Sequence, residues 1–426
     1  MAISTCKGHN ESSILPENIF IMKKLFPFFI TCCCLPLLLQ CNGQNREGNR
    51  NPANNPSKVG GECETGYCEL IYYGMPTSIN HTDTSAGWFE KGQKLMVTGT
   101  VYQIDGRTPA ANVILYYHHT DNEGYYSPGD KTPHNSTRHG HIRGWVKTDS
   151  NGRYTIYSIR PGAYPGAEDP QHIHLIVKEP DIETEYWIHD MVFDDDPRLL
   201  PYQKKHPNPN PRCGSGILRV LLKDSVQIAE HDIVLGLNIP NYPHNKVASI
   251  SSGLAIGEEQ PSFGPHHAYG PDKGTETCPV CKYGRYQGIL FFVGNHPQWE
   301  SIKSWLRFLE ARAGALSPLL KVYFVYGNSL QYNSSLRQAQ LEKLGNELQL
   351  KKTALTYVPS FNDKNSDVHL NKINPDAENT FIIYRHRIIV DTFINLAAKQ
   401  QNFDKINTAL RRTAGMFNNL PEPPHH

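Results

Sequence analysis

The tripeptide His172-Ile173-His174 constrains the fold of this chain more than any other feature. On an extended strand, residues i and i+2 project from the same face, so both imidazoles can bind one metal ion. Tyr164, eight residues earlier, can add a phenol to the same ion. By itself a His-x-His pair is weak evidence, because a strand with one solvated face often carries two polar residues there. Together with the tyrosine it predicts a strand-rich domain that holds a metal.

Length and charge limit the other possibilities. A chain of 426 residues can form two or three domains, each with its own core. The charges nearly cancel, with 42 Lys and Arg against 41 Asp and Glu, and no long basic run occurs. Nucleic-acid binding therefore has no electrostatic support.

The N-terminus reads as a targeting segment. Two lysines precede an apolar run over residues 25–39, which is too short to cross a hydrocarbon core of roughly 30 Å as a helix. This pattern predicts a signal segment over residues 1–41, with its core at 22–41 and Met22 as the start.

The apolar run ends in Leu-Leu-Gln-Cys, which resembles the lipobox of bacterial lipoproteins. Gln40 stands where a small residue is usual. Two alternatives follow: lipidation at Cys41, which would tether the protein to a bacterial membrane, or simple secretion. Residues 42–60, rich in Asn, Gly, Pro and Arg, are typical of a flexible tether.

After residue 94 the pattern changes to short strands separated by turn residues. The segments are rich in Val, Ile, Tyr and Thr, and Asp-Gly and Asn-Gly pairs lie between them. We predict a β-sandwich over residues 61–240. Many extracellular prealbumin-like modules share this pattern and catalyse nothing. The expected strands are 95–102, 112–118, 144–148, 154–159 and 172–177.

Four motifs in this domain carry a more specific resemblance. They are Gly124-Tyr125-Tyr126-Ser127, Arg143-Gly144-Trp145-Val146-Lys147-Thr148-Asp149, Pro161-Gly162-Ala163-Tyr164-Pro165 and His172-Ile173-His174. In order and spacing, residues 90–240 resemble the intradiol ring-cleavage dioxygenases. The resemblance implies a non-haem Fe(3+) ion held by Tyr126, Tyr164, His172 and His174.

The chemistry accounts for these residue types. A free phenol has a pKa near 10, but a trivalent ion favours the phenolate and so displaces the proton. The resemblance implies that a catechol-type diol and O2 are the substrates. It also implies that Tyr164 leaves the iron to take up a substrate proton, while Tyr126 stays bound. For the neighbouring Tyr125, a packed or solvent-facing position is the expectation, and a ligand role is the alternative.

Two segments depart from the family pattern. Many members have an arginine shortly before the His-x-His pair and a glutamine after it, where this chain has Asp169 and Asp190. The acids predict that substrates with a carboxylate are disfavoured, and that neutral or amine-bearing catechols are preferred. Arg143 could supply the missing cation as a catalytic residue. The alternative is a structural salt bridge between Arg143 and the acidic residues 194–196.

The C-terminal part alternates strands and helices. We predict a linker over residues 241–276, an α/β domain over residues 277–415 and a tail over residues 416–426. The β-α-β-α-β-β-α order resembles the thioredoxin-like fold, especially its peroxiredoxin branch. The expected strands are 288–293, 321–326, 380–384 and 388–393, and the expected helices are 299–312, 335–350 and 396–412.

The cysteines do not follow the thioredoxin pattern. The loop after the first strand of this domain, residues 294–299, has none, although thioredoxins place a reactive pair there. Cys278 and Cys281 precede that strand instead, and form a redox pair, half a metal site or a structural disulfide. Cys63 and Cys68 are expected to pair in an oxidising compartment, while Cys213 has no evident partner.

The sequence therefore leaves three alternative functions open. The first is an exported Fe(3+)-dependent intradiol dioxygenase with a thioredoxin-like accessory domain. The second is a surface protein that binds iron or a polyphenol without turnover. The third is a thiol-disulfide protein that uses Cys278 and Cys281. Colour separates them, because tyrosinate bound to Fe(3+) absorbs visible light.

Overall fold

A computed structural model describes residues 58–63, 67–130, 138–243, 251–330 and 332–423. The predicted signal segment, Cys41 and most of the tether lie outside these residues. No helix in the described ranges is both long and apolar enough to cross a bilayer.

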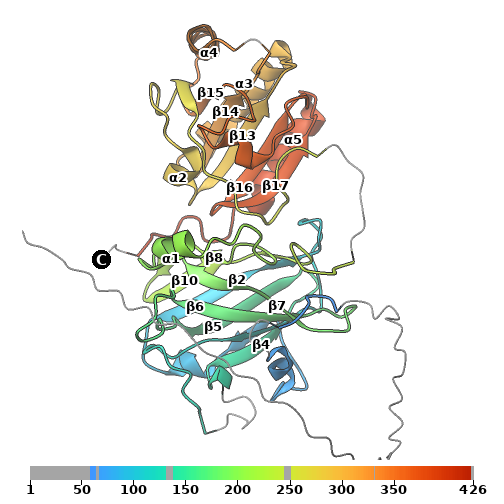
Figure 1. Cartoon of the computed structure of the whole chain (residues 1–426), viewed down its shortest axis with the longest axis vertical. Coiled ribbons are helices and arrows are strands. Elements are labelled where there is room, and N and C mark those ends of the chain that lie inside the picture. The colour runs from blue at the N-terminus through green and yellow to red at the C-terminus, as the bar shows by residue number, and fades with distance from the viewer. Residues whose placement is uncertain (1–57, 64–66, 131–137, 244–250, 331, 424–426) are drawn as a thin grey trace, which may run out of the picture. The chain divides into compact units, whose positions relative to one another are not determined.

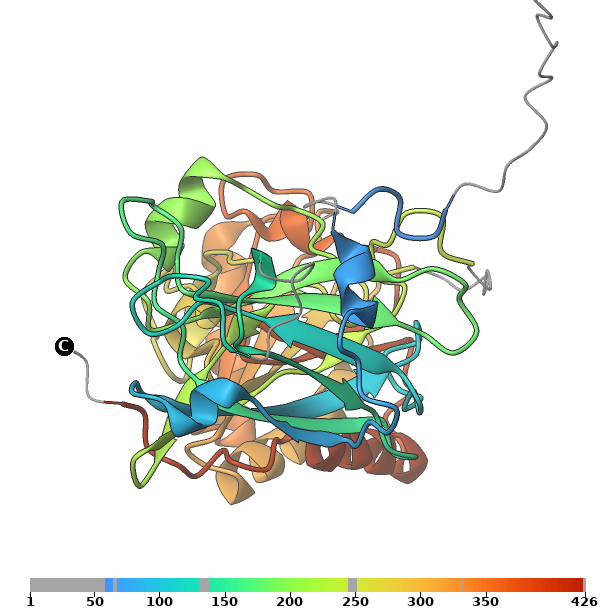
Figure 2. The same cartoon turned by 90° about the horizontal axis from the view of Figure 1, so that it is seen from below.

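The N-terminal domain is a sandwich of two mixed sheets (Figures 1 and 2). The first has the order β1-β5-β2-β10-β9, with β11 paired to β2, and the second has the order β4-β3-β6-β7-β8. All five predicted strands of this domain are confirmed within two residues at each end. The bounds are Thr82–Thr84 (β1), Lys94–Tyr102 (β2), Ile114–His118 (β3), Arg143–Lys147 (β4), Arg153–Ile159 (β5), His172–Lys178 (β6), Tyr186–Phe193 (β7), Ile217–Leu218 (β8), Val220–Lys223 (β9), Val226–Glu230 (β10) and Ile233–Val234 (β11), with short helices at Cys68–Tyr72 (η1), Ala86–Phe89 (η2) and Leu199–Lys205 (α1).

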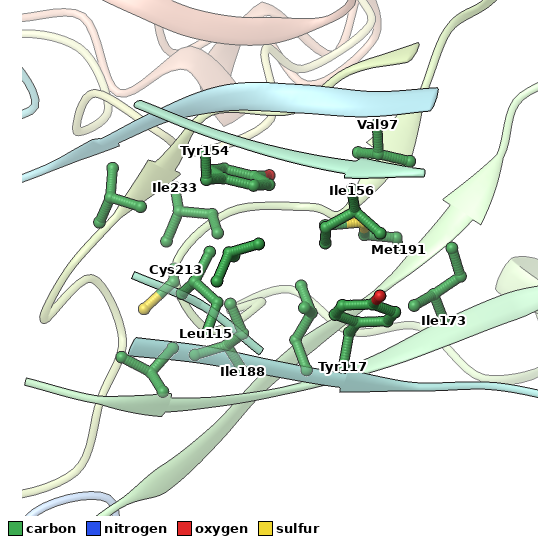
Figure 3. Close-up of a cluster of buried hydrophobic side chains, with 14 of the residues drawn as sticks. Val97, Leu115, Tyr117, Tyr154, Ile156, Ile173, Ile188, Met191, Cys213 and Ile233 are labelled. Atoms are coloured by element: carbon green, nitrogen blue, oxygen red, sulfur yellow. The ribbon is translucent and has the colours of Figure 1, made fainter. Parts of the chain in front are cut away.

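Alternation along the strands builds the sandwich core. In β5, Tyr154 and Ile156 are buried while Thr155 between them is less so, because successive side chains point to opposite faces. Figure 3 shows these two side chains on one side of the core and Leu115 and Tyr117 of β3 on the other. The apolar core thus holds the two sheets face to face.

The C-terminal domain has one six-stranded sheet in the order β12-β15-β14-β13-β16-β17. The strand β13 pairs in parallel with β14 and antiparallel with β16, and every one of its residues is buried. The apolar side chains of α3, α4 and α5 pack on one face of this sheet. The bounds are His266–Tyr269 (β12), Pro279–Tyr283 (α2), Gln287–Val293 (β13), Trp299–Ala315 (α3), Leu320–Tyr326 (β14), Ser334–Leu348 (α4), Thr353–Tyr357 (β15), Val368–Asn371 (η4), Thr380–Arg385 (β16), Ile388–Ile394 (β17) and Gln400–Thr413 (α5).

Two predictions for this domain were wrong. The strand β15 was missed, although it pairs in parallel with β14. The predicted linker 241–276 contains β12, which pairs with β15, so the α/β domain begins before residue 277. The four strand positions and three helices that the sequence predicted are present. The resemblance of this domain to thioredoxins stays a prediction.

The cysteines pair locally. Disulfides join Cys63 to Cys68 and Cys278 to Cys281. Cys278 is the N-cap of α2, where its sulfur accepts a hydrogen bond from the backbone N–H of Cys281. Cys213 is buried and free.

Candidate metal centre

The hydroxyl oxygen of Tyr164 lies at the centre of the four predicted ligands. It is 2.8 Å from Oη of Tyr126, 3.0 Å from Nε2 of His172 and 3.2 Å from Nε2 of His174. The four residues come from β6 and from two separate loops, so the fold brings together side chains that span 48 positions in the sequence. The structure thus places all four predicted ligand atoms around one point.

Glycines let the two tyrosine loops meet. Gly124, with φ at 92°, precedes Tyr126, and a Cβ built on it would lie 2.2 Å from the carbonyl oxygen of Ala163. A Cβ on Gly162 would lie 2.5 Å from the backbone nitrogen of Gly124. Only glycine fits at either position without backbone movement. The Gly-x-Tyr and Pro-Gly-x-Tyr motifs therefore bring Tyr126 and Tyr164 together by close backbone packing.

A second hydrogen bond orients each imidazole. The Nδ1 atom of His172 lies 2.8 Å from the carbonyl oxygen of Pro170, and Nδ1 of His174 lies 2.9 Å from Oδ1 of Asp190. Both partners can only accept, so each Nδ1 carries the proton and each Nε2 keeps its lone pair. Metal-binding histidines usually have this arrangement, in which the second nitrogen donates to a carbonyl or a carboxylate.

The donor set fits a cation. The hydroxyl oxygen of Tyr164 faces two imidazole nitrogens and the oxygen of Tyr126, so four possible ligand atoms converge here. Burial raises the pKa of both Tyr126 and Tyr164, and keeps the phenols protonated unless a positive charge compensates. A metal ion between these atoms would meet both imidazole lone pairs and stabilise the phenolates. The site therefore fits a ferric ion, the hard, highly charged metal that phenolate oxygen favours.

Asp190 could also be a ligand, because its carboxylate, His172 and His174 present ligand atoms within 4.8 Å of one another. The hydrogen bond to Nδ1 argues against that role, since it places Asp190 beside the nitrogen that does not face the tyrosines. Burial opposes ionisation of Asp190, but the charge and hydrogen bond of His174 outweigh it and hold the pKa of the carboxyl below its ordinary value. Asp190 therefore orients a ligand.

A cavity of about 570 Å³ opens beside the metal centre. It has room for a substituted aromatic ring. The lining includes Tyr164, His172 and His174, so a molecule inside it can reach the metal position. The sandwich also contributes Asp169, Pro170, Trp187, His189, Asp190, Val192, Leu199, Tyr202, Gln203, His206, Asn208, Pro211 and Ser215.

Arg143 does not line this cavity. Its guanidinium donates to the hydroxyl of Tyr116 at 3.1 Å and to the carbonyl oxygen of Tyr73, and lies 5.1 Å from the ring centre of Trp145. The alternative, a salt bridge from Arg143 to the acidic residues 194–196, is not found among the described residues. Asp195 instead receives two hydrogen bonds, of 2.9 and 2.8 Å, from Arg160.

A row of stacked rings behind His174 was missed by sequence reasoning. The ring of His118 lies 4.7 Å from that of His174 on one side and 3.6 Å from that of His139 on the other. Nδ1 of His139 is hydrogen-bonded to the hydroxyl of Tyr116. The same hydroxyl accepts the hydrogen bond from Arg143. Two His-rich stretches, at 118–119 and 139–141, were the available signal.

Tyr125 is 55% exposed, so its expected position facing solvent is confirmed. The neighbouring Tyr126 points inward instead, because successive residues of an extended segment face opposite ways.

Part of the chain is similar in sequence to known dioxygenases. The family model described as Dioxygenase matches residues 71–204. Catechol 1,2-dioxygenase of Acinetobacter baylyi is 30% identical over 95 residues, which cover 22% of this chain and 30% of that protein. 6-Chlorohydroxyquinol 1,2-dioxygenase of Cupriavidus pinatubonensis is 28% identical over 127 residues, 26% of this chain and 44% of that protein. The chain thus spans less than half the length of these curated relatives.

A solved structure also matches, that of the dioxygenase domain of a dioxygenase carbohydrate-binding protein fusion from Streptomyces sp. SirexAA-E. It is 23% identical and covers 38% of this chain and 92% of that one, with a TM-score of 0.29. The similarity rests on the family model and the sequence relatives. Over residues 71–204, the N-terminal domain is thus similar to the intradiol ring-cleavage dioxygenases.

Proposed function

We propose that the protein cleaves catechol-type rings with O2, between the two carbons that carry the hydroxyl groups, at a non-haem Fe(3+) site. The observation that carries the proposal is the convergence of two phenol oxygens and two imidazole nitrogens, with Oη of Tyr164 within 3.2 Å of the other three. The adjoining cavity supplies room for the ring.

Tyr126, Tyr164, His172 and His174 would hold the metal. When bound, a ferric ion would draw electron density from a catechol and make its ring reactive toward O2. Tyr164 both lines the cavity and contacts the two imidazoles, so its phenolate oxygen can accept a proton from an incoming hydroxyl group. Asp190 and the Pro170 carbonyl keep the imidazole lone pairs aimed at the metal position.

The test is oxygen uptake by the iron-loaded protein with catechol, together with identification of the product. Intradiol cleavage yields an open-chain dicarboxylate that contains both atoms of O2. We expect uptake equal to the catechol consumed, and its loss in Tyr164→Phe, which keeps the ring but removes the oxygen. A ring-opened aldehyde, or no uptake by the iron-loaded protein, would reject the proposal.

Iron or polyphenol binding without turnover is the second candidate. One observation favours it: no lysine or arginine is among the described residues that line the cavity, so the cation that many family members place near the ring is missing there. Colour and catechol binding without oxygen uptake would select this candidate.

Export is a separate proposal. The short apolar run that ends at Cys41 supports it, and so do the two disulfides, which persist in oxidising compartments. Mass spectrometry of the mature protein should find cleavage before Cys41 and an acyl chain on that residue. A processed chain without acyl groups would indicate secretion, and an intact N-terminus in the cytosol would refute export.

A further inference from the structure

The described residues that line the cavity include carboxylates but no lysine or arginine. The sandwich contributes two carboxylates to the lining, Asp169 and Asp190. Asp190 already pairs with His174. For the carboxylate of Asp169, no hydrogen bond or ion pair is found within the described ranges, although its side chain is partly buried. Asp169 therefore brings a negative charge without a partner to a cavity that receives substrate.

Three cations contact Asp169 or residues within two positions of it, and none of them pairs with its carboxylate. Lys205 pairs with Glu168 at 2.5 Å, and Arg160 is held by Asp195. Arg198 contacts the backbone carbonyl oxygen of Asp169 at 3.4 Å, but forms no ion pair with the carboxylate at 4.0 Å or less. None of the three lines the cavity. The charge of Asp169 thus remains available to a ligand.

The carboxylate of Asp169 and the metal centre share the same cavity. Asp169 lines the same cavity as the proposed ligands Tyr164 and His172. The next residue, Pro170, accepts the hydrogen bond from Nδ1 of His172 through its carbonyl oxygen. A ring bound to the metal would therefore lie within range of the Asp169 carboxylate.

We propose that Asp169 selects catechols that carry a protonated amine side chain and disfavours those that carry a carboxylate. The inference rests on the proposed function and names the substrate class of the same site. An ammonium group in the cavity would pair with Asp169, whereas a carboxylate would meet a like charge, and no lysine or arginine among the described residues that line the cavity would offset it. Of the two acids that the sequence singled out, Asp190 orients a ligand and Asp169 alone is free to set specificity.

The experiment measures oxygen uptake by the iron-loaded protein with dopamine, catechol and protocatechuate, which carry positive, no and negative charge outside the diol. We expect kcat/KM to fall in that order. In Asp169→Asn the ratio of dopamine to protocatechuate should drop by roughly 5- to 10-fold, as for loss of one partly screened ion pair. Glu168→Gln, which removes the adjacent exposed acid, should keep the wild-type ratio.

Binding is measured in parallel, from the shift of the visible absorption band as each catechol is added. A highest kcat/KM and tightest binding for protocatechuate would overturn the inference, and so would an unchanged ratio in Asp169→Asn. If no catechol is turned over but dopamine binds more tightly than protocatechuate in an Asp169-dependent way, the proposed enzyme function fails and the selectivity stands. If none binds, both fail.

Discussion

His174 is held between Tyr164 and Asp190, with Nε2 3.2 Å from the phenol oxygen and Nδ1 2.9 Å from the carboxylate. The strand pairing makes this possible, because β6 and β7 are antiparallel neighbours with an irregular register between Ile173 and Leu175. The ring is therefore fixed from both ends before any metal binds.

The first prediction concerns this orienting contact. Asp190→Asn should weaken iron affinity by roughly 10- to 100-fold, because the amide lacks the charge that holds the Nδ1 proton. Competition with a chelator measures the affinity. Asp181→Asn, at an exposed position, is the matched control. Equal affinities in Asp190→Asn and the control would show that Asp190 does not support the ligand.

The second prediction compares the visible spectra of variants at the neighbouring residues Tyr125 and Tyr126. Tyr126→Phe removes a proposed ligand, so the visible tyrosinate band of the iron-loaded protein should shift and weaken. Tyr125→Phe removes a hydroxyl from a side chain that is 55% exposed and should leave the spectrum unchanged. The opposite pattern in the two spectra would move the ligand assignment to Tyr125.

The third prediction is a pH dependence of stability. Nδ1 of His141 lies 2.5 Å from the carbonyl oxygen of Ser127, and Nε2 lies 2.5 Å from Glu90. Burial lowers the pKa of His141, but these two partners outweigh it and raise the pKa above 6.5. The folded protein therefore binds this proton more tightly than the unfolded chain, and the stabilisation is present below pH 6.5 and lost as pH rises through the folded pKa.

Urea midpoints measure this effect between about pH 6 and about pH 8. The wild type should lose more stability over that range than His141→Gln, by about 0.5–1 kcal/mol for one partly exposed ion pair. His81→Gln, at an exposed position, serves as the control. Parallel pH curves for the wild type and His141→Gln would contradict the prediction.

The fourth prediction concerns the Cys278–Cys281 disulfide. Because the two cysteines close a very short loop, replacing both with serine should cost about 2 kcal/mol in stability of the α/β domain. Catechol turnover by the sandwich should persist. If the variant keeps its stability but loses a disulfide-reductase activity that the wild type shows, the pair is redox-active and the structural interpretation is wrong.

Features that depend on residues close together in the sequence could be predicted. The His-x-His pair fixes two ligands on one strand face. The resemblance of the two tyrosine motifs to the dioxygenase family is what placed Tyr126 and Tyr164 near His172 and His174. Strand alternation in β2 and β5 likewise predicts one buried face.

Long-range pairings were beyond the same reasoning. Nothing local in Asp190 shows that it lies opposite His174, because the register of β6 and β7 decides that. The stack of His118 on His139 joins residues 21 positions apart, and the hydrogen bonds of Arg143 depend on Tyr73 and Tyr116, on segments that no motif links. The strand β15 was missed because its five buried residues lack the long apolar run of β13.

Iron content tests the central claim most directly. The wild-type protein, loaded with Fe(3+) and freed of loose metal, should hold one iron per chain and show a red-brown tyrosinate band. The double variant His172→Ala with His174→Ala should lose most of the iron and the band, while His81→Ala should keep both. Full iron content and colour in the double variant would contradict the metal centre described here.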